Sequence, residues 1–457
     1  MLLNIIDFGA VGDGVTMNTE AFRRVCAAAE ANGEPHNVIL VPPGVFVSGT
    51  ISLPSNVTLR LEAGAVLKAS ANPDDFQPNP FIFPRRDTAE GTNYDYLALY
   101  FIGSLNCENI SLEGGGIIDG NGTNYWEDVC YDGEPWIENN PTFPVNYRVL
   151  KAKPRRFAMV VFWKCRNVAL RDLTLVNAPA YTVWPQGCDD VRIQDITIRN
   201  PYQGPNTDAL DIDCSENVII SGCNIAAGDD CIAVKSDTSR LGEDRPSRQL
   251  VVTNCVFSST ACAIRLGYEG DGAITDCVFS NIVIYDTHHG IDMLSLTPCT
   301  RPDFKTGTPI ECIQFSCITM RNVAHPFFIW CGTENEKQPY SAAVKNLTFS
   351  DRDIRARGGS FIGSKDGSPV RNVAFRNVRI HLAEHSFYDG QKCIAYPNLW
   401  GTVRLPDVLR FHRVESCRLD AVELTRLPAN DGQGECLAWT ETTLDIDSVR
   451  QASSGKA

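Results

Sequence analysis

The sequence predicts an all-β protein, a right-handed parallel β-helix with one helix at its N-terminal end. Three observations indicate this fold. Similar short segments recur every 20–30 residues or so, each alternates apolar and polar residues, and Asn, Asp or Gly stands between them. Alternation with a period of two is typical of a half-buried strand, and asparagine tolerates the left-handed backbone of a tight corner. Each coil is therefore expected to bury its inward side chains against its neighbours.

The repeats are visible as recurring headers followed by a strand-like run. Cys165-Arg-Asn-Val-Ala-Leu, Cys188-Asp-Asp-Val-Arg-Ile and Cys214-Ser-Glu-Asn-Val-Ile are three consecutive copies, and related segments begin at Ser55, Cys107, Ala273 and Val370. A β-sandwich, the alternative, also has many short strands, but it would show hairpin turns instead of repeated headers.

One helix is expected near the start of the chain. Asn18 or Thr19 can cap it, Phe22, Val25 and Cys26 form an apolar stripe, and Gly33 ends it. Because a solenoid needs its open end covered, this helix is expected to cap the column.

The length of 457 residues allows two ordinary domains or one elongated repeat domain. The repeats favour a single domain over residues 1–445, with a tail at 446–457. Four polar and aromatic insertions interrupt the repeat, and they either wall a groove or cover strand edges: 76–98, 120–155, 296–309 and 332–341.

Composition and charge exclude several function classes. A formal net charge of −14 and a pI near 5.0 argue against nucleic acid or an anionic membrane surface as partner. No apolar run approaches the 18 residues of a membrane span. The N-terminus lacks the features of a signal peptide, which predicts a cytoplasmic protein, or a secreted one if a leader has been removed.

The eighteen cysteines are expected to be buried free thiols, since most stand at apolar repeat positions and the chain is long. No CxxC pair occurs, so no metal site and no cofactor are expected.

The strongest chemical signal is a group of three carboxylates, Asp208, Asp229 and Asp230. Asp208 precedes Asp229 by 21 positions, about one coil, so the winding is expected to stack them on one wall. Grouped carboxylates repel each other and are typical of glycoside hydrolysis, in which one carboxyl protonates the leaving oxygen and another activates water or attacks carbon. The alternative is a structural calcium site that includes Asp211 and Asp213.

Several motifs in order resemble glycoside hydrolase family 28, the polygalacturonase family, a pectin-lyase-like fold. The resemblance runs from about Asp7 to Ile380, and the segments that carry it are Phe8-Gly-Ala-Val-Gly-Asp-Gly, Gly115-Gly-Ile-Ile-Asp-Gly-Asn-Gly before Trp126, Asn177-Ala-Pro-Ala-Tyr-Thr, Asn206-Thr-Asp and Gly228-Asp-Asp-Cys-Ile-Ala-Val-Lys-Ser.

The resemblance implies roles for the three acids. Asp229 would be the general acid, and Asp208 with Asp230 would hold and deprotonate the attacking water, with inversion of configuration. A carboxyl separation of about 6.5–9.5 Å would support inversion, and about 5–5.5 Å would indicate retention.

Two other motifs of the family are missing. The histidine of its Gly-His-Gly falls at Cys262, and the cations of its Arg-Ile-Lys, which grip the substrate carboxylate, fall at Asp292 and Leu294. Arginine's bidentate fork cannot be imitated there, so the sugar is expected to differ from a plain galacturonide. The hypothesis is an exo-acting hydrolase of a pectin-derived or related oligosaccharide.

The expected substrate-binding residues surround the acids. Arg265 is expected to form a remodelled pocket and is a candidate replacement for the missing carboxylate clamp; Lys235 is expected to bridge a neighbouring acid. The full set is Asn206, Lys235, Arg265, Tyr268, Glu269, His289 and Asp292.

Two other functions stay open from the sequence alone. A β-helix can bind carbohydrate without cleaving it, although a binder has no use for repelling acids. A uronate lyase or epimerase needs a base to abstract a proton, for which Lys235, Arg265 and the pair His288–His289 are the candidates.

Overall fold

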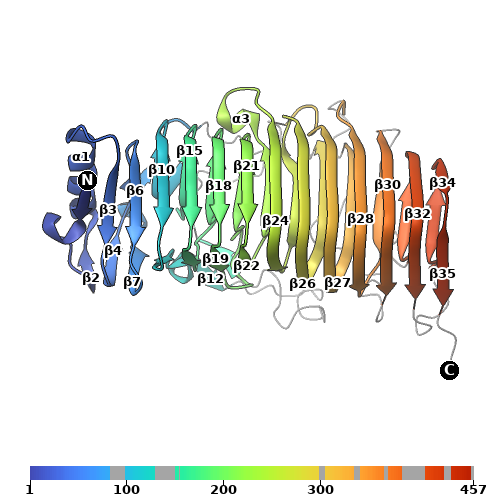
Figure 1. Ribbon diagram of the computed structural model, residues 1–457, viewed down its shortest axis with the longest axis horizontal. Coiled ribbons are helices and arrows are strands. Elements are labelled where there is room, and N and C mark those ends of the chain that lie inside the picture. The colour runs from blue at the N-terminus through green and yellow to red at the C-terminus, as the bar shows by residue number, and fades with distance from the viewer. Residues whose placement is uncertain are drawn as a thin grey trace.

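The protein is an elongated column of parallel strands, with its termini at opposite ends (Figure 1). The computed structural model describes residues 1–82, 98–128, 150–153, 155–297, 304–333, 340–364, 369–382, 407–426 and 434–453. Strands from successive coils pair in parallel along the column, which confirms the predicted parallel β-helix.

Three ladders of strands form the walls of the column. The first ladder, which holds the candidate site, contains β5 (Ile51–Ser52), β9 (Leu99–Leu105), β14 (Ala158–Trp163), β17 (Val183–Gln186), β20 (Leu210–Asp213), β23 (Ile232–Ser236), β25 (Cys262–Gly270), β29 (Ser360–Ser364), β31 (Leu409–His412) and β33 (Leu437–Thr440). The second contains β1 (Leu2–Asn4), β3 (Asn37–Val41), β6 (Val57–Leu61), β10 (Glu108–Glu113), β15 (Arg166–Arg171), β18 (Asp189–Gln194), β21 (Glu216–Ser221) and β34 (Leu444–Ile446). The third contains β2 (Asp13–Met17), β4 (Gly44–Ser48), β7 (Ala65–Ala69), β11 (Ile117–Asp119), β16 (Thr174–Val176), β19 (Thr197–Arg199), β22 (Asn224–Ala227) and β35 (Val449–Ser453).

Six long strands run through corners and join more than one ladder: β24 (Ser247–Ser259), β26 (Ile274–Thr297), β27 (Ile310–Thr333), β28 (Val344–Ala356), β30 (Val370–Leu382) and β32 (Val414–Arg426). The remaining strands pair antiparallel beside the column: β8 (Gln77–Pro78) with β9, and β12 (Trp126–Asp128) with β13 (Leu150–Ala152). The short helices are η1 (Ile5–Phe8), η2 (Pro73–Asp75), η4 (Gly122–Tyr125) and α3 (Thr238–Leu241).

Helix α1 (Thr19–Ala31) lies at the N-terminal end of the column, as predicted (Figure 1). Its buried face includes Phe22, Val25 and Cys26, the predicted stripe. Asn32 is the C-cap, and Gly33 follows it with φ 68°, the left-handed conformation with which glycine ends a helix, as predicted. Asn18 caps the helix by position only, because its side chain bonds to the backbone of neighbouring segments instead. None of the helices in the described ranges is long and apolar enough to cross a membrane.

The core is a continuous stack of inward side chains, one from each coil. In the second ladder this stack runs in register through fully or almost fully buried aliphatic residues from Ile39 to Val252 and then through four phenylalanines, Phe279, Phe315, Phe349 and Phe375. Successive rings of these four lie 4.8–5.2 Å apart between centroids and are nearly parallel. Identical faces thus repeat at the spacing of adjacent strands, which is why the sequence repeat predicts the fold.

Asparagine ladders fix the corners, in agreement with the sequence analysis. Asn56, Asn109 and Asn167 each have positive φ. The side-chain amide of Asn109 donates to Oδ1 of Asn56 at 2.7 Å, and that of Asn167 donates to Oδ1 of Asn109 at 2.8 Å. The same arrangement links Asn346 with Asn372.

The repeat headers were aligned wrongly by one residue at the third copy. Cys165 and Cys188 lie on adjacent coils, but Ser215 and not Cys214 follows them, since the backbone N–H of Cys188 donates to Oγ of Ser215. Fifteen cysteines in the described ranges are free thiols, most of them buried, as expected, whereas Cys312 and Cys317 are exposed.

The column extends beyond the predicted domain boundary at residue 445. Strands β34 and β35 both pair with β32, so residues up to Ser453 belong to the parallel β-helix and not to a tail. Most of the four predicted insertions lies outside the described residues, so their role as groove walls stays a prediction.

Candidate active site

Consecutive coils of the first ladder bring the candidate site residues to one height on the wall. Backbone hydrogen bonds join the segment at Thr182 to Asp208, Ala209 to Asp230, and Cys231 to Cys262. Strand pairing then places Cys262 beside His289, and His289 beside His325. The resulting row, here called the site row, is Tyr181, Asp208, Asp230, Cys262, His289 and His325.

The three predicted acids lie together. One carboxylate oxygen from each of Asp208, Asp229 and Asp230 lies within 4.8 Å of the others, and their exposed fractions are 4%, 8% and 3%. The stacking predicted from the 21-residue interval is thus present in the structure. The separation that distinguishes inversion (about 6.5–9.5 Å) from retention (about 5–5.5 Å) is measured between carboxyl groups and is larger than the distance between their nearest oxygens.

Lys235 is the cation at the centre of the acids, as predicted. Its Nζ lies 2.8 Å from Asp211, 2.6 Å from Glu269 and 3.7 Å from Asp208, and it donates to the hydroxyl of Tyr181 at 2.7 Å. All of these groups are buried. A buried cation among several carboxylates is strongly coupled to them, so its loss would leave uncompensated negative charge.

Burial and mutual repulsion raise the pKa values of two acids, Asp208 and Asp211. Burial, with Asp211 and Asp229 nearby, raises the pKa of Asp208 well above its usual range. Burial raises the pKa of Asp211 to about 7, although Lys235 opposes the shift. For Lys235 itself, burial acts to lower the pKa, but Asp211 and Glu269 outweigh it and hold the pKa well above its usual value. The group therefore keeps a proton more readily than isolated carboxylates would.

Arg265 connects Asp230 to the next coil. Its Nε lies 2.5 Å from Oδ2 of Asp230, its Nη1 lies 3.5 Å from Oδ2 of Asp292, and its Nη2 donates to Sγ of Cys262 at 2.8 Å. Asp292 Oδ2 lies 2.8 Å from Nδ1 of His289. Burial acts to raise the pKa of Asp292, but Arg265 and His289 hold it below its usual value, so this carboxylate is ionised and accepts the Nδ1 proton.

The predicted substrate-binding residues divide into accessible and buried ones. Asn206 and Tyr268 are partly exposed, and the side-chain oxygen of Asn206 accepts from Arg156 at 2.8 Å. His289 and Asp292 have exposed fractions of 1% and 0% and bond to each other, so in this structure each holds the other's side chain in position. Their contact with sugar stays a prediction, as does that of Arg265, which is engaged by Asp230 and Asp292.

The alternative calcium site cannot draw on Asp211 and Asp213. Asp211 is occupied by the ammonium group of Lys235, and Asp213 accepts from the amide of Gln186 and from the backbone N–H of Asp237. An oxygen-lined calcium cage needs 6–8 such ligands turned toward one point, which these two acids do not provide. In the described ranges, three clusters have suitable donors for a metal: the three acids, Cys262 with His289 and Asp292, and His288 with His289 and His325.

Sequence reasoning missed two roles. Tyr181 lies within a motif that the sequence analysis quoted, and Asp211 was considered only as a calcium ligand, yet both contact Lys235. The coil register does not show the contact by itself. Asp213 is the register partner of Lys235, whereas the ammonium group of Lys235 reaches Asp211, which pairs with Ala233.

Comparisons with known proteins identify the family and the relatives of this chain. The model of a family described as glycosyl hydrolases family 28 matches residues 34–394. A probable polygalacturonase of Vitis vinifera is 29% identical over 396 residues, which cover 83% of this chain and 74% of that protein. An endo-polygalacturonase of Pectobacterium carotovorum subsp. carotovorum is 25% identical over 336 residues, covering 74% and 77%.

Solved structures share the fold. An exopolygalacturonase from Thermotoga maritima superposes with a TM-score of 0.65 at 21% identity, covering 99% of this chain and 91% of that one. A family 28 exopolygalacturonase from Yersinia enterocolitica gives 0.67 at 17% identity, covering 98% and 78%. These neighbours are right-handed parallel β-helices, which confirms the predicted handedness.

Proposed function

The chain belongs to glycosyl hydrolases family 28 and is a polygalacturonase-like glycoside hydrolase, and we propose that it removes sugars from the end of a pectin-derived or related oligosaccharide with inversion of configuration. In this proposal Asp229 protonates the leaving oxygen, and Asp208 and Asp230 hold and deprotonate the attacking water. The observation that carries it is the convergence of these carboxylates within 4.8 Å. One water can donate hydrogen bonds of about 2.7–2.8 Å to two carboxylate oxygens at this spacing.

The electrostatics support an acid and a base in one cluster. Because like charges at this distance resist full ionisation, the cluster retains a proton at neutral pH, as a general acid requires. The raised pKa of Asp208 makes its ionised form a stronger base. The placement of the proton on Asp229 and the inversion of configuration both come from the family resemblance.

The pocket is proposed to differ from that of galacturonases. Asp292 and Leu294 stand where the family has its cationic clamp, and both are fully buried in this chain. The cations nearest the acids, Lys235 and Arg265, are held by carboxylates. We therefore expect a sugar whose carboxylate is absent, masked or bound elsewhere. The exo action is supported by the exopolygalacturonases among the structural neighbours.

The acid assignment is tested by leaving-group dependence. On the natural oligosaccharide, D229N should lose about 10²–10⁴-fold in rate, because that is the usual contribution of a general acid. On an aryl glycoside with a good leaving group D229N should recover most of its rate, whereas D208N should be slow on both substrates. D276N is the matched control, since Asp276 is exposed and has φ 56°, which asparagine tolerates. A D229N enzyme as active as D276N on the oligosaccharide would refute the assignment.

Product analysis tests the rest of the proposal. Pectic, esterified and neutral oligosaccharides are incubated with the enzyme, and proton NMR identifies the anomer formed first. An α-to-α or β-to-β outcome refutes inversion, and an unsaturated-sugar absorbance indicates a lyase. A rapid fall in polymer viscosity with few new reducing ends refutes exo action.

A further inference from the structure

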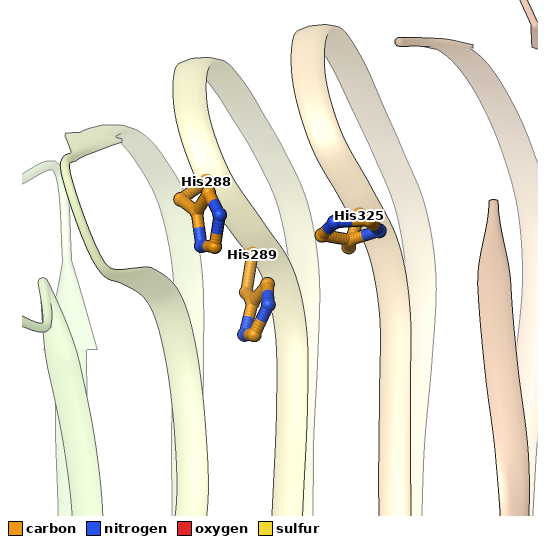
Figure 2. A group of neighbouring side chains, drawn as sticks. All are labelled: His288, His289 and His325. Atoms are coloured by element: carbon orange, nitrogen blue, oxygen red, sulfur yellow. The ribbon is translucent and has the colours of Figure 1, made fainter. Parts of the chain in front are cut away.

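Three histidines gather at the end of the site row, where His289 and His325 are its last two members and His288 precedes His289. His288 and His289 belong to β26, and His325 belongs to the next coil, on β27, where it pairs with His289 (Figure 2). One ring nitrogen of each lies within 4.8 Å of the others. The hydrolytic proposal assigns no role to His288 or His325.

The rings already have the spacing of a metal-bound trio. Their centroids are 4.6 Å apart for His288 and His289, 5.5 Å for His288 and His325, and 5.3 Å for His289 and His325. A Zn–N bond of about 2.0–2.1 Å places each ring centre roughly 3.2 Å from the metal, so three rings on a tetrahedron have centres about 5.2 Å apart. The centroid spacing is thus that of three imidazoles around one ion, and the stacked rings of His288 and His289, whose planes differ by 22°, must tilt to turn their nitrogens toward it.

The surroundings fix which nitrogens carry lone pairs. Nδ1 of His289 donates to the ionised Asp292, and Nδ1 of His325 lies 2.9 Å from the carbonyl oxygen of Gly359, which can only accept. Both rings therefore carry their proton on Nδ1, and Nε2 holds the lone pair. A histidine bonded to a carboxylate or a backbone carbonyl through its other nitrogen is the usual arrangement in metal sites.

The charge state suits a metal as well. Neutral imidazoles bind a metal without losing a proton. Asp292 adds one negative charge behind His289.

The cluster of Cys262, His289 and Asp292 is the weaker candidate. Arg265 lies 2.8 Å from the sulfur of Cys262 and 3.5 Å from Asp292, so its guanidinium group already compensates the negative charge of this cluster. Burial also raises the pKa of the Cys262 thiol well above its usual range, which disfavours the thiolate that a metal needs.

We propose that His288, His289 and His325 bind one divalent transition-metal ion, with Zn²⁺ the preferred ion, and that Asp292 orients His289 for this purpose. Imidazole ligands suit zinc, and three protein ligands leave a fourth position for water or another ligand. The site joins two adjacent coils across the corner, so the ion stabilises the folded column. The proposal does not depend on the identity of the sugar or on hydrolysis.

Metal binding is measured directly on the full chain with any histidine tag removed. The background is C312S/C317S, because these two exposed thiols would bind zinc adventitiously. Metal-stripped protein is dialysed against Zn²⁺ or Co²⁺, and metal content, the visible spectrum of Co²⁺ and Tm are recorded. We expect one zinc per chain, the intense absorption of tetrahedral Co²⁺, and a Tm that rises with zinc concentration.

Two variants separate a metal site from a stack of aromatic rings. H325F keeps a ring against its neighbours and removes a ligand, and H288Q changes the partly exposed member of the trio. Both should lose the bound zinc and the zinc-dependent rise in Tm, while H412F, a half-buried histidine on β31, should keep them. D292N should weaken zinc binding by about 10–100-fold.

Two results would overturn the proposed zinc site. If the parent protein binds no more zinc than H325F and its Tm does not respond to zinc, the three histidines only pack against each other and the proposal is wrong. Loss of zinc in H412F to the same extent as in H325F also overturns it, since the binding would then be nonspecific.

Discussion

Replacement of Lys235 by methionine should destabilise the protein and make its stability strongly pH-dependent. Methionine keeps the length of the side chain but removes the cation that contacts Asp211, Glu269 and Asp208. Removal of one partner from a buried ion pair costs about 3–5 kcal/mol, because the remaining charge is left in a poorly polarisable site. The expected loss of stability comes from the uncompensated buried carboxylates, because methionine nearly preserves the packing.

The expected change in Tm follows from the length of the chain. An entropy of unfolding of about 2.1 cal/mol/K per residue gives about 1 kcal/mol/K for 457 residues. A loss of about 3–5 kcal/mol therefore lowers Tm by about 3–5 °C at pH 8.

The pH dependence has a definite sign. Burial already raises the pKa of Asp208 and Asp211, and removal of Lys235 raises both further. Groups with raised pKa in the folded state contribute stability at low pH that disappears as pH rises through the folded pKa. The difference in Tm between K235M and wild type should therefore be largest at pH 8 and smaller at pH 5.

Calorimetry of three proteins tests this reasoning. K164M is the matched control, because Lys164 forms a single, partly exposed ion pair with Glu243 at 3.4 Å and should change stability by at most about 1 kcal/mol. The double variant D211N/K235M should regain part of the loss, since it removes one uncompensated acid. A K235M Tm within a degree of K164M at pH 8, or a deficit that grows toward pH 5, would refute the electrostatic account.

Two predictions concern the column itself. N109A should lower stability by about 2–4 kcal/mol, because alanine is strained at φ 58° by about 1–2 kcal/mol and two ladder hydrogen bonds are lost, whereas N109G should lose less; denaturant titration compares them. R352I should raise stability by about 1–3 kcal/mol, because Arg352 is buried, its guanidinium has no hydrogen-bond partner in the described ranges, and its neighbour in register is Val378. Burial lowers the pKa of Arg352 to about 9, so the wild type should gain stability as pH rises through 9 and the advantage of R352I should shrink; a lower Tm for R352I at pH 7 contradicts this.

Much of the fold was predictable because every coil of a solenoid repeats the same local sequence pattern. Period-two strands and corner asparagines identify each coil independently, and the capping helix has its own apolar stripe. The errors arose where neighbouring positions have similar chemistry. Cys214 and Ser215 can both head a repeat, and only the hydrogen bond from Cys188 to Ser215 shows which one does. The C-terminal strand β35 was missed because an exposed edge strand has little apolar alternation.

The candidate site was predictable in its residues more than in its contacts. The three acids could be assigned to one wall from their interval, and Lys235 could be expected to bridge an acid. Contacts between coils depend on the number of residues per coil. In the site row this number varies from 22, between Asp208 and Asp230, to 36, between His289 and His325. No local pattern fixes these intervals, so the grouping of His288, His289 and His325 appears only in three dimensions.

The missing histidine of the family has a neighbour one coil away. Cys262 stands at the family position, and Nδ1 of His289 lies 3.8 Å from its sulfur because the two residues pair in register. A one-coil shift moves a group by about 4.8 Å along the wall, too far for direct contact with the acids. His289 instead bonds to Asp292, and Asp292 and Asp230 hold Arg265 from both sides. Through Asp292 the imidazole therefore helps to fix the position of Arg265, which bonds to Asp230.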